Sequence, residues 1–292
     1  MNNHTASNNF FILRVSSSVD PNLSAAGATL HQGYSHAGWG ILAVRGLAAL
    51  TLAAAGMAQA APALPPLLQA DGALNPAWRF VGFPKKHADL PATRFEAAHV
   101  DGQAALKVST ASSYGTLVHD TPDAAPGRLQ WRWRLDQPLT GGKAPPDLRT
   151  KAGDDAALKV CVMFDHPLER VPFVERTVLR LARSVSGENL PTATLCYVWD
   201  SAAPAGLQGA NPYTRRVRFI SLQGQGAALG QWATETRDVA QDFATLFADE
   251  LPTGAPLPHV RSVLIGADSD NTASRSTGWL AGLHWAPAAA PI

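Results

Sequence analysis

The chain has 292 residues, of which 46% are hydrophobic and eight are tryptophan; this supply of core residues argues against wholesale disorder. Only 16% of the residues are charged, the formal net charge is +1 and no basic run occurs, which removes any electrostatic case for nucleic-acid binding. The 22 prolines and 24 glycines predict many turns.

The N-terminus reads as a targeting segment. Residues 47–55 are an unbroken run of small and apolar side chains, preceded by Arg45 and followed by Ala-Gln-Ala at 58–60. That order is typical of a signal peptide cut after a small-x-small motif. The run is about half of the ~20 residues that a membrane span requires, so a retained transmembrane helix is the weaker interpretation. We predict cleavage near 60/61 and a periplasmic or secreted protein.

Residues 1–43 are polar, with no periodicity and no cluster of positive charge. One hypothesis is that translation begins at Val44, which would leave a short signal peptide with Arg45 as its positive end; a start at Met1 is the alternative. Beyond the signal peptide we expect a Pro/Ala-rich lead-in at 61–77, a single domain at 78–286 and a short tail at 287–292.

The domain begins with short strands. An aromatic strand is predicted at 78–83, before Pro84, and further strands at 104–109 and 115–118. At 129–135 leucines and tryptophans alternate with polar and charged residues, and 158–164 repeats a period of two. This period places the apolar set of each strand on one face. We favour the core for Trp131 and Trp133.

The second half of the domain alternates strands with two helical segments. Val174, Val178, Leu181 and Val185 recur every three to four residues with arginines between them, which predicts a short amphipathic helix on the edge of a sheet. Strands follow at 194–199, 215–222 and 232–239, then a short helix at 239–247, and strands at 260–267 and 279–285. About nine or ten strands, one or two short helices and no βαβ alternation predict an all-β antiparallel sandwich of the jelly-roll type.

The two cysteines, Cys161 and Cys196, both lie in apolar strands. An exported chain meets an oxidising compartment, where they could pair. A free buried cysteine is equally natural in such strands. Both interpretations stay open.

Several short motifs together resemble a known family. They are WRWRL, KAGDD, YVWD, NPYTRRV, LGQWATETRDV and DSDNT, spread between about 78 and 285. The set resembles a bacterial exported family catalogued as domain of unknown function number 3047. The resemblance implies an envelope protein whose jelly roll is similar to carbohydrate-binding modules, and it implies no activity or catalytic residue.

Acidic and amide side chains at strand ends predict a candidate Ca²⁺ site, because this ion takes six to eight oxygen ligands. The predicted ligands are Asp268, Asp270 and Asn271, with Asp154 and Asp155 from another loop. The alternative is that these side chains make ordinary turn hydrogen bonds to the backbone.

A second candidate site combines rings with polar groups, since sugars stack their C–H faces on aromatic rings and present hydroxyls to carboxylates and amides. Its predicted residues are Tyr197, Trp199, Asp200, Asn211, Tyr213 and Arg216. Core packing is the alternative for the rings. For Arg216, as for Arg132, Arg134 and Arg218, ordinary pairing with carboxylates such as Glu235 is favoured over binding of an acidic glycan or phosphate.

The leading hypothesis is an exported, non-catalytic β-sandwich that binds a polysaccharide or another envelope ligand, with a structural Ca²⁺. The first alternative is a hydrolase acting on a glycan or other polymer, although no paired-carboxylate motif or G-x-S-x-G elbow occurs. The second alternative is an envelope scaffold that binds another protein.

Overall fold

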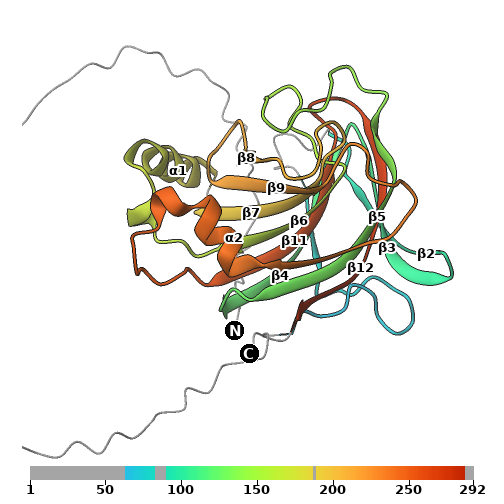
Figure 1. The fold of residues 1–292 in the computed structure, drawn as a ribbon, viewed down its shortest axis with the longest axis horizontal. Helices are drawn as coiled ribbons and strands as arrows, with labels where there is room; N and C mark the ends of the chain where they lie inside the picture. Colours follow the sequence, from blue (N-terminus) through green and yellow to red (C-terminus); the bar gives the residue numbers. More distant parts are fainter. Residues whose placement is uncertain (1–62, 83–89, 187–188, 287–292) are drawn as a thin grey trace, which may run out of the picture. The chain divides into compact units, whose positions relative to one another are not determined.

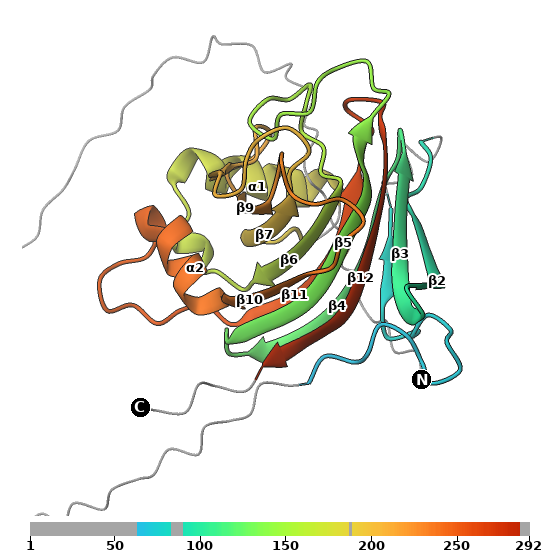
Figure 2. The ribbon, with the colours of Figure 1, turned by 45° about the vertical axis from the view of Figure 1, so that its right-hand side comes forward.

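The structure, a computed structural model, describes residues 63–82, 90–186 and 189–286. Within these ranges the chain forms twelve strands in two sheets, with two α-helices and two short 3-10 helices. The predicted signal peptide and the tail at 287–292 lie outside the described residues. Figures 1 and 2 show the two sheets packed face to face.

The larger sheet has seven strands. In spatial order they are β1 (Arg79–Val81), β4 (Tyr114–Ala124), β11 (Val260–Asp268), β6 (Leu158–Phe164), β7 (Ala193–Trp199), β9 (Val217–Gln223) and β8 (Gln208–Ala210). The smaller sheet has five strands, in the order β10 (Ala233–Asp238), β5 (Arg128–Thr140), β12 (Arg275–Ala286), β3 (Gln103–Ala111) and β2 (Arg94–Val100). The predicted all-β sandwich is confirmed, and β2 and β8 are strands that the sequence pattern did not reveal.

One pair departs from the predicted antiparallel order. β7 and β9 are parallel, whereas the other paired strands of the described sheets are antiparallel. After β7 the chain turns back through β8 at the sheet edge, and β9 then inserts between β8 and β7. Because β9 is antiparallel to β8, it runs parallel to β7.

The core between the sheets contains the alternating apolar residues of β5. Leu129, Trp131, Trp133 and Leu135 are completely buried, as the period of two predicted. The ring centroids of Trp131 and Tyr197 are 5.3 Å apart, and those of Trp133 and Trp199 are 5.5 Å apart. These pairs join β5 to β7 across the two sheets, so the aromatic residues of both strands form one core.

A second apolar layer covers the outer face of the larger sheet. It includes Met163, Val198 and Phe219, together with Leu148 from the β5–β6 connection. This layer explains why β6 and β7 are buried on both faces. Cys161 and Cys196 lie directly opposite each other within it and form a disulfide, which decides between the two interpretations of these residues.

The two helices lie on the side of the molecule opposite to β2 and β3 (Figures 1 and 2). Both predicted helices are present, as α1 (Phe173–Ser186) and α2 (Val239–Leu246); the 3-10 helices are η2 (Leu168–Arg170) and η3 (Ala248–Glu250). Asp238 is the N-cap of α2, and its carboxylate accepts from the Gln241 N–H at 2.9 Å. No helix of the described ranges is long and apolar enough to cross a membrane.

The orientation of α1 differs from what its spacing suggests. The predicted stripe of Val174, Val178 and Leu181 faces solvent, while Leu179 and Ala182 face the body and pack with Leu190. The helix is therefore confirmed, but its valine stripe is not the face that packs on the protein.

Candidate functional site

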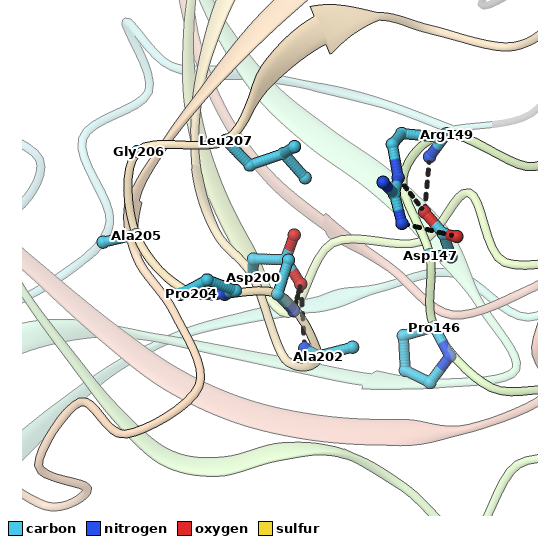
Figure 3. A pocket seen from close by; sticks show the side chains of 10 residues that line it. Pro146, Asp147, Arg149, Asp200, Ala202, Pro204, Ala205, Gly206 and Leu207 are labelled. Atoms are coloured by element: carbon cyan, nitrogen blue, oxygen red, sulfur yellow. Dashed lines mark hydrogen bonds and ion pairs between the residues drawn. The ribbon is translucent and has the colours of Figure 1, made fainter.

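A hollow of about 520 Å³ lies beside the end of β7, between the β5–β6 connection and the β7–β8 loop (Figure 3). Its walls are mostly apolar and come from prolines, alanines and a leucine. Its polar side chains are those of Asp147, Arg149 and Asp200. The hollow thus combines a few polar groups with apolar walls, as small-molecule sites do.

Asp200 provides the buried polar group of this hollow. It follows β7 directly and is only 3% exposed. Its Oδ1 accepts hydrogen bonds from the N–H groups of Ala202 and Ala203, at 2.8 and 2.9 Å. Its Oδ2 is buried and accepts no hydrogen bond from the described residues, and in Figure 3 one oxygen of this carboxylate points into the space that the labelled residues enclose. A buried acceptor left without a donor costs about 1–3 kcal/mol, so a ligand that donates to Oδ2 would recover this energy.

Arg149 and Asp147 form a bidentate ion pair at the hollow. Arg149 Nε lies 2.9 Å from Asp147 Oδ1 and Nη2 lies 3.2 Å from Oδ2. This pairing lowers the pKa of Asp147 and raises the pKa of Arg149, to which the charge of Asp200 also contributes. Because the pair is neutral overall, an ionised Asp200 would give the hollow one surplus negative charge, which favours neutral or cationic ligands over anions.

Two glycines allow the loops that form the walls of the hollow to pack closely against neighbouring backbone segments. A Cβ at Gly224 would lie 2.3 Å from the carbonyl oxygen of Ala203, and one at Gly153 would lie 2.4 Å from the backbone nitrogen of Asp147. The same segments are tied by hydrogen bonds from the Gln225 N–H to Ala203 O and from the Asp147 N–H to Gly153 O. Any side chain at these positions would push the loops apart.

Three of the five predicted metal ligands come together. One carboxylate oxygen each of Asp155, Asp268 and Asp270 lie within 4.8 Å of one another, where they could hold a metal ion. Asp155 accepts hydrogen bonds from the backbone of Asn271 and from Thr272, and Asp268 accepts from the Ala156 N–H at 2.8 Å. These bonds connect the β5–β6 and β11–β12 connections.

The other two predicted ligands have different roles here. Asp154 Oδ2 accepts from the side-chain amide of Asn211 at 2.6 Å, and Asn271 Nδ2 donates to the backbone oxygen of Asp154 at 2.8 Å. Burial first, and the charge of Asp268 second, raise the pKa of Asp154 to about 7. The same two causes raise the pKa of Asp155.

Lys159 is the cation of this cluster. Its Nζ lies 2.8 Å from Asp268 Oδ2, and both side chains are nearly buried. Burial alone would lower the pKa of Lys159, but Asp268 and the neighbouring groups raise it overall. Burial also raises the pKa of Tyr114, whose ring lies under the ammonium group, to about 12.

The predicted aromatic surface is not formed by the rings of β7. Tyr197 and Trp199 are buried between the sheets, and the Tyr197 hydroxyl donates to Asp242 at 2.8 Å. Tyr213 is half-buried, with the Lys151 ammonium 5.3 Å from its ring centroid and its hydroxyl bonded to Lys151 O. Packing between the sheets covers the ring faces of Tyr197 and Trp199, so the prediction that these two rings stack on a sugar needs correction.

Arg216 also lies in the interior of the protein. Its guanidinium is 4% exposed and pairs with Glu175 and Glu250, while the neighbouring Arg218 pairs with Glu250 and Asp249. Ordinary pairing was the favoured interpretation, and the structure confirms it with other partners than Glu235. Glu235 instead accepts from the indole N–H of Trp133 at 3.0 Å and from Gln223.

Sequence reasoning missed three residues of these sites. Asp147 and Arg149 sit in a Pro-rich loop without a motif, and only their D-x-R spacing hints at a local ion pair. Lys159 carried a stronger signal, because a lysine inside a continuous apolar strand is buried only together with an acidic partner. Among the predicted ligand residues, Asp200 is the one that lines the hollow.

Comparisons with known proteins place the chain in a family without giving it an activity. A family model described as "Protein of unknown function (DUF3047)" matches residues 76–284. No curated protein sequence matches significantly.

Solved structures show a distant likeness. The family 11 carbohydrate-binding module of the cellulase Lic26A-Cel5E of Clostridium thermocellum is 8% identical, with a TM-score of 0.35 over 75% of this chain and 92% of that one. A point mutant of the family 29 module CBM29-2, complexed with cellulohexaose, is 10% identical, with a TM-score of 0.30 over 76% of this chain and 90% of that one. At these scores the likeness assigns neither a ligand nor a site to this chain.

Proposed function

The chain belongs to the DUF3047 family of proteins of unknown function, and on that premise we propose that its β-sandwich binds a saccharide, without cleaving it, in the hollow at Asp200. The observation that carries the proposal is Asp200, which lines the hollow and whose buried Oδ2 has no donor among the described residues. A sugar hydroxyl is a neutral donor of the right kind. Its neighbouring C–H groups would contact Pro146, Pro204 and Leu207.

None of the described residues that line the hollow carries an aromatic ring, so the proposed recognition differs from the stacking that the sequence suggested. Hydrogen bonding to Asp200 and to the Asp147–Arg149 pair would supply orientation, and the apolar walls would supply contact area. The surplus negative charge favours neutral sugars or amino sugars over uronic acids. The disulfide supports the further proposal that the domain acts outside the cytoplasm, because such bonds persist in oxidising compartments.

The test is binding of the full chain to a panel of neutral, amino and acidic oligosaccharides and polysaccharides, by calorimetry and by retention, with reducing ends measured in the same samples. Asp200→Asn keeps an oxygen for the 202–203 turn but replaces Oδ2 with a donor, so affinity should fall roughly 10- to 100-fold. Asp71→Asn is the matched control, since Asp71 accepts from the Ala73 N–H in a similar turn elsewhere.

Retention of neutral or amino sugars, lost in Asp200→Asn and kept in Asp71→Asn, would support the proposal. Release of reducing ends would show a hydrolase instead, and absence of binding across the panel would favour the scaffold hypothesis. Equal binding by both variants would show that a sugar binds elsewhere on the domain.

We also propose that Asp155, Asp268 and Asp270 hold a structural Ca²⁺. When ionised, these three carboxylates and the Lys159 ammonium leave a surplus of two negative charges, which a dication would cancel. Calcium at large excess over its dissociation constant should raise the melting temperature of chelator-treated protein, and Asp270→Asn should remove the effect. A melting temperature that calcium does not change would contradict this site.

A further inference from the structure

Helix α1 leaves its most apolar stripe largely exposed, and Val174 and Val178 of this stripe also line a hollow beside residues 211–216. Val174 is 71% exposed and Leu181 63%, and Phe173 and Val178 are exposed as well. Leu179, on the opposite side, is 2% exposed and packs with Ala182 and Leu190. We call the four exposed residues the α1 stripe, and exposed apolar side chains gathered on one element mark interaction sites.

The charges of α1 and η2 are mainly positive, with four arginines against Glu169 and Glu175. Arg176 and Arg180 lie on α1 and Arg170 lies in η2 just before it, and none of them forms an ion pair with a carboxylate of the described residues. The one acidic residue of α1, Glu175, is neutralised by its ion pairs with Arg215 and Arg216. The surface of η2 and α1 therefore combines an apolar stripe with an excess of arginines.

We infer that α1 binds the surface of an anionic lipid bilayer, with the α1 stripe buried among the headgroups. Interfacial helices of this kind join an apolar face to flanking basic residues, and binding increases with apolar area and with anionic lipid. Figure 1 shows α1 at the edge of the ribbon, on the side opposite to β2 and β3. A second copy of the chain is a poorer occupant, because a twofold contact through the same stripe would bring like-charged arginines together.

The test uses the full chain with a polarity-sensitive fluorophore on a single introduced cysteine. Both natural cysteines are in the disulfide, so Val178→Cys would supply the free thiol for labelling. Leu229→Cys is the matched control, since Leu229 is also exposed but lies in the β9–β10 connection. The position of the probe is informative because the apolar run at 47–55 could itself hold the chain on vesicles.

With vesicles of phosphatidylglycerol and phosphatidylcholine we expect a blue shift and a several-fold rise in fluorescence at position 178 and not at 229. Val174→Ser/Leu181→Ser in the labelled chain should weaken the response roughly tenfold or more. Arg176→Gln/Arg180→Gln should weaken the response to anionic vesicles.

Three outcomes would overturn the inference. The first is an unchanged probe at 178 on vesicles that do bind the chain. The second is an equal response to vesicles of pure phosphatidylcholine. The third is a response without vesicles that grows with protein concentration, which would assign the α1 stripe to self-association.

Discussion

The ammonium nitrogen of Lys159 lies 2.8 Å from a carboxylate oxygen of Asp268, inside the protein, where both side chains have almost lost contact with water. This ion pair links β6 to the neighbouring strand β11, and Asp268 also accepts from the backbone of Ala156. Removing one partner of such a pair leaves an uncompensated buried charge, whereas removing both is far less costly.

Lys159→Met should therefore lower the free energy of unfolding by about 3–5 kcal/mol. Lys159→Met/Asp268→Asn should recover a large part of that loss, and Lys143→Met at an exposed position should have little effect. Urea denaturation followed by tryptophan fluorescence would measure all three. A single variant as stable as the parent chain would show that the pair does not contribute to folding.

The pH dependence of stability should reflect the pKa of Asp154, which is about 7 in the folded protein against an ordinary value of 3.8. Between these values the folded state keeps a proton that the unfolded state has released, so stability falls as pH rises from about 4 to about 7, by up to about 1.4 kcal/mol per unit. Asp155, whose pKa is also raised, acts in the same direction.

Denaturation at several pH values in that window would measure the slope, and Asp154→Asn should reduce it. Glu250 does not mask the effect: burial opposes its ionisation, but Arg216 and His166 hold its pKa at about 2. Its contribution to stability is therefore complete above its ordinary pKa and is lost only as the pH falls towards 2. A flat profile between pH 4 and 7 would contradict a protonated Asp154.

Gly224→Ala should damage the hollow without touching a polar group of it. The added methyl group would meet the backbone of Ala203 and Ala205, so we expect the free energy of unfolding to fall by about 1–3 kcal/mol. Because the clash moves the wall of the proposed saccharide site, we also expect a lower affinity for the saccharide. Gly127→Ala is the control, because a Cβ there meets nothing within 4 Å. Thermal unfolding and calorimetry would separate the two effects; unchanged affinity in a folded variant would place the ligand elsewhere.

Reducing the Cys161–Cys196 disulfide should lower the free energy of unfolding by about 3–4 kcal/mol, since it closes a loop of residues 35 apart in sequence. Guanidinium denaturation with and without reductant would measure the loss. Cys161→Ala/Cys196→Ala should resemble the reduced protein and be insensitive to reductant. Equal stability in both conditions would mean that packing alone holds β6 to β7.

The sequence predicted the positions of the strands better than the contacts made by the residues between them. The alternation in β5 identified Leu129, Trp131, Trp133 and Leu135 as one buried face, because side chains of a strand must alternate between its faces. β2 was not predicted because it exposes most of its residues and lacks an apolar stripe. The spacing on α1 revealed a helix but not the direction of its stripe, since periodicity defines a face and not what covers it.

The sequence by itself determined the positions of most strands and helices and the acidic character of the loops at Asp154–Asp155 and Asp268–Asp270. It also indicated the family. Only the tertiary structure decided which of these groups meet. It buried Tyr197 and Trp199, paired Arg216 with Glu250, joined Cys161 to Cys196 and placed Asp200, with its buried Oδ2 lacking a donor, in the wall of a hollow. The reason is that a strand's pattern specifies its two faces, whereas its neighbours depend on sheet order, and here residues distant in sequence share each contact.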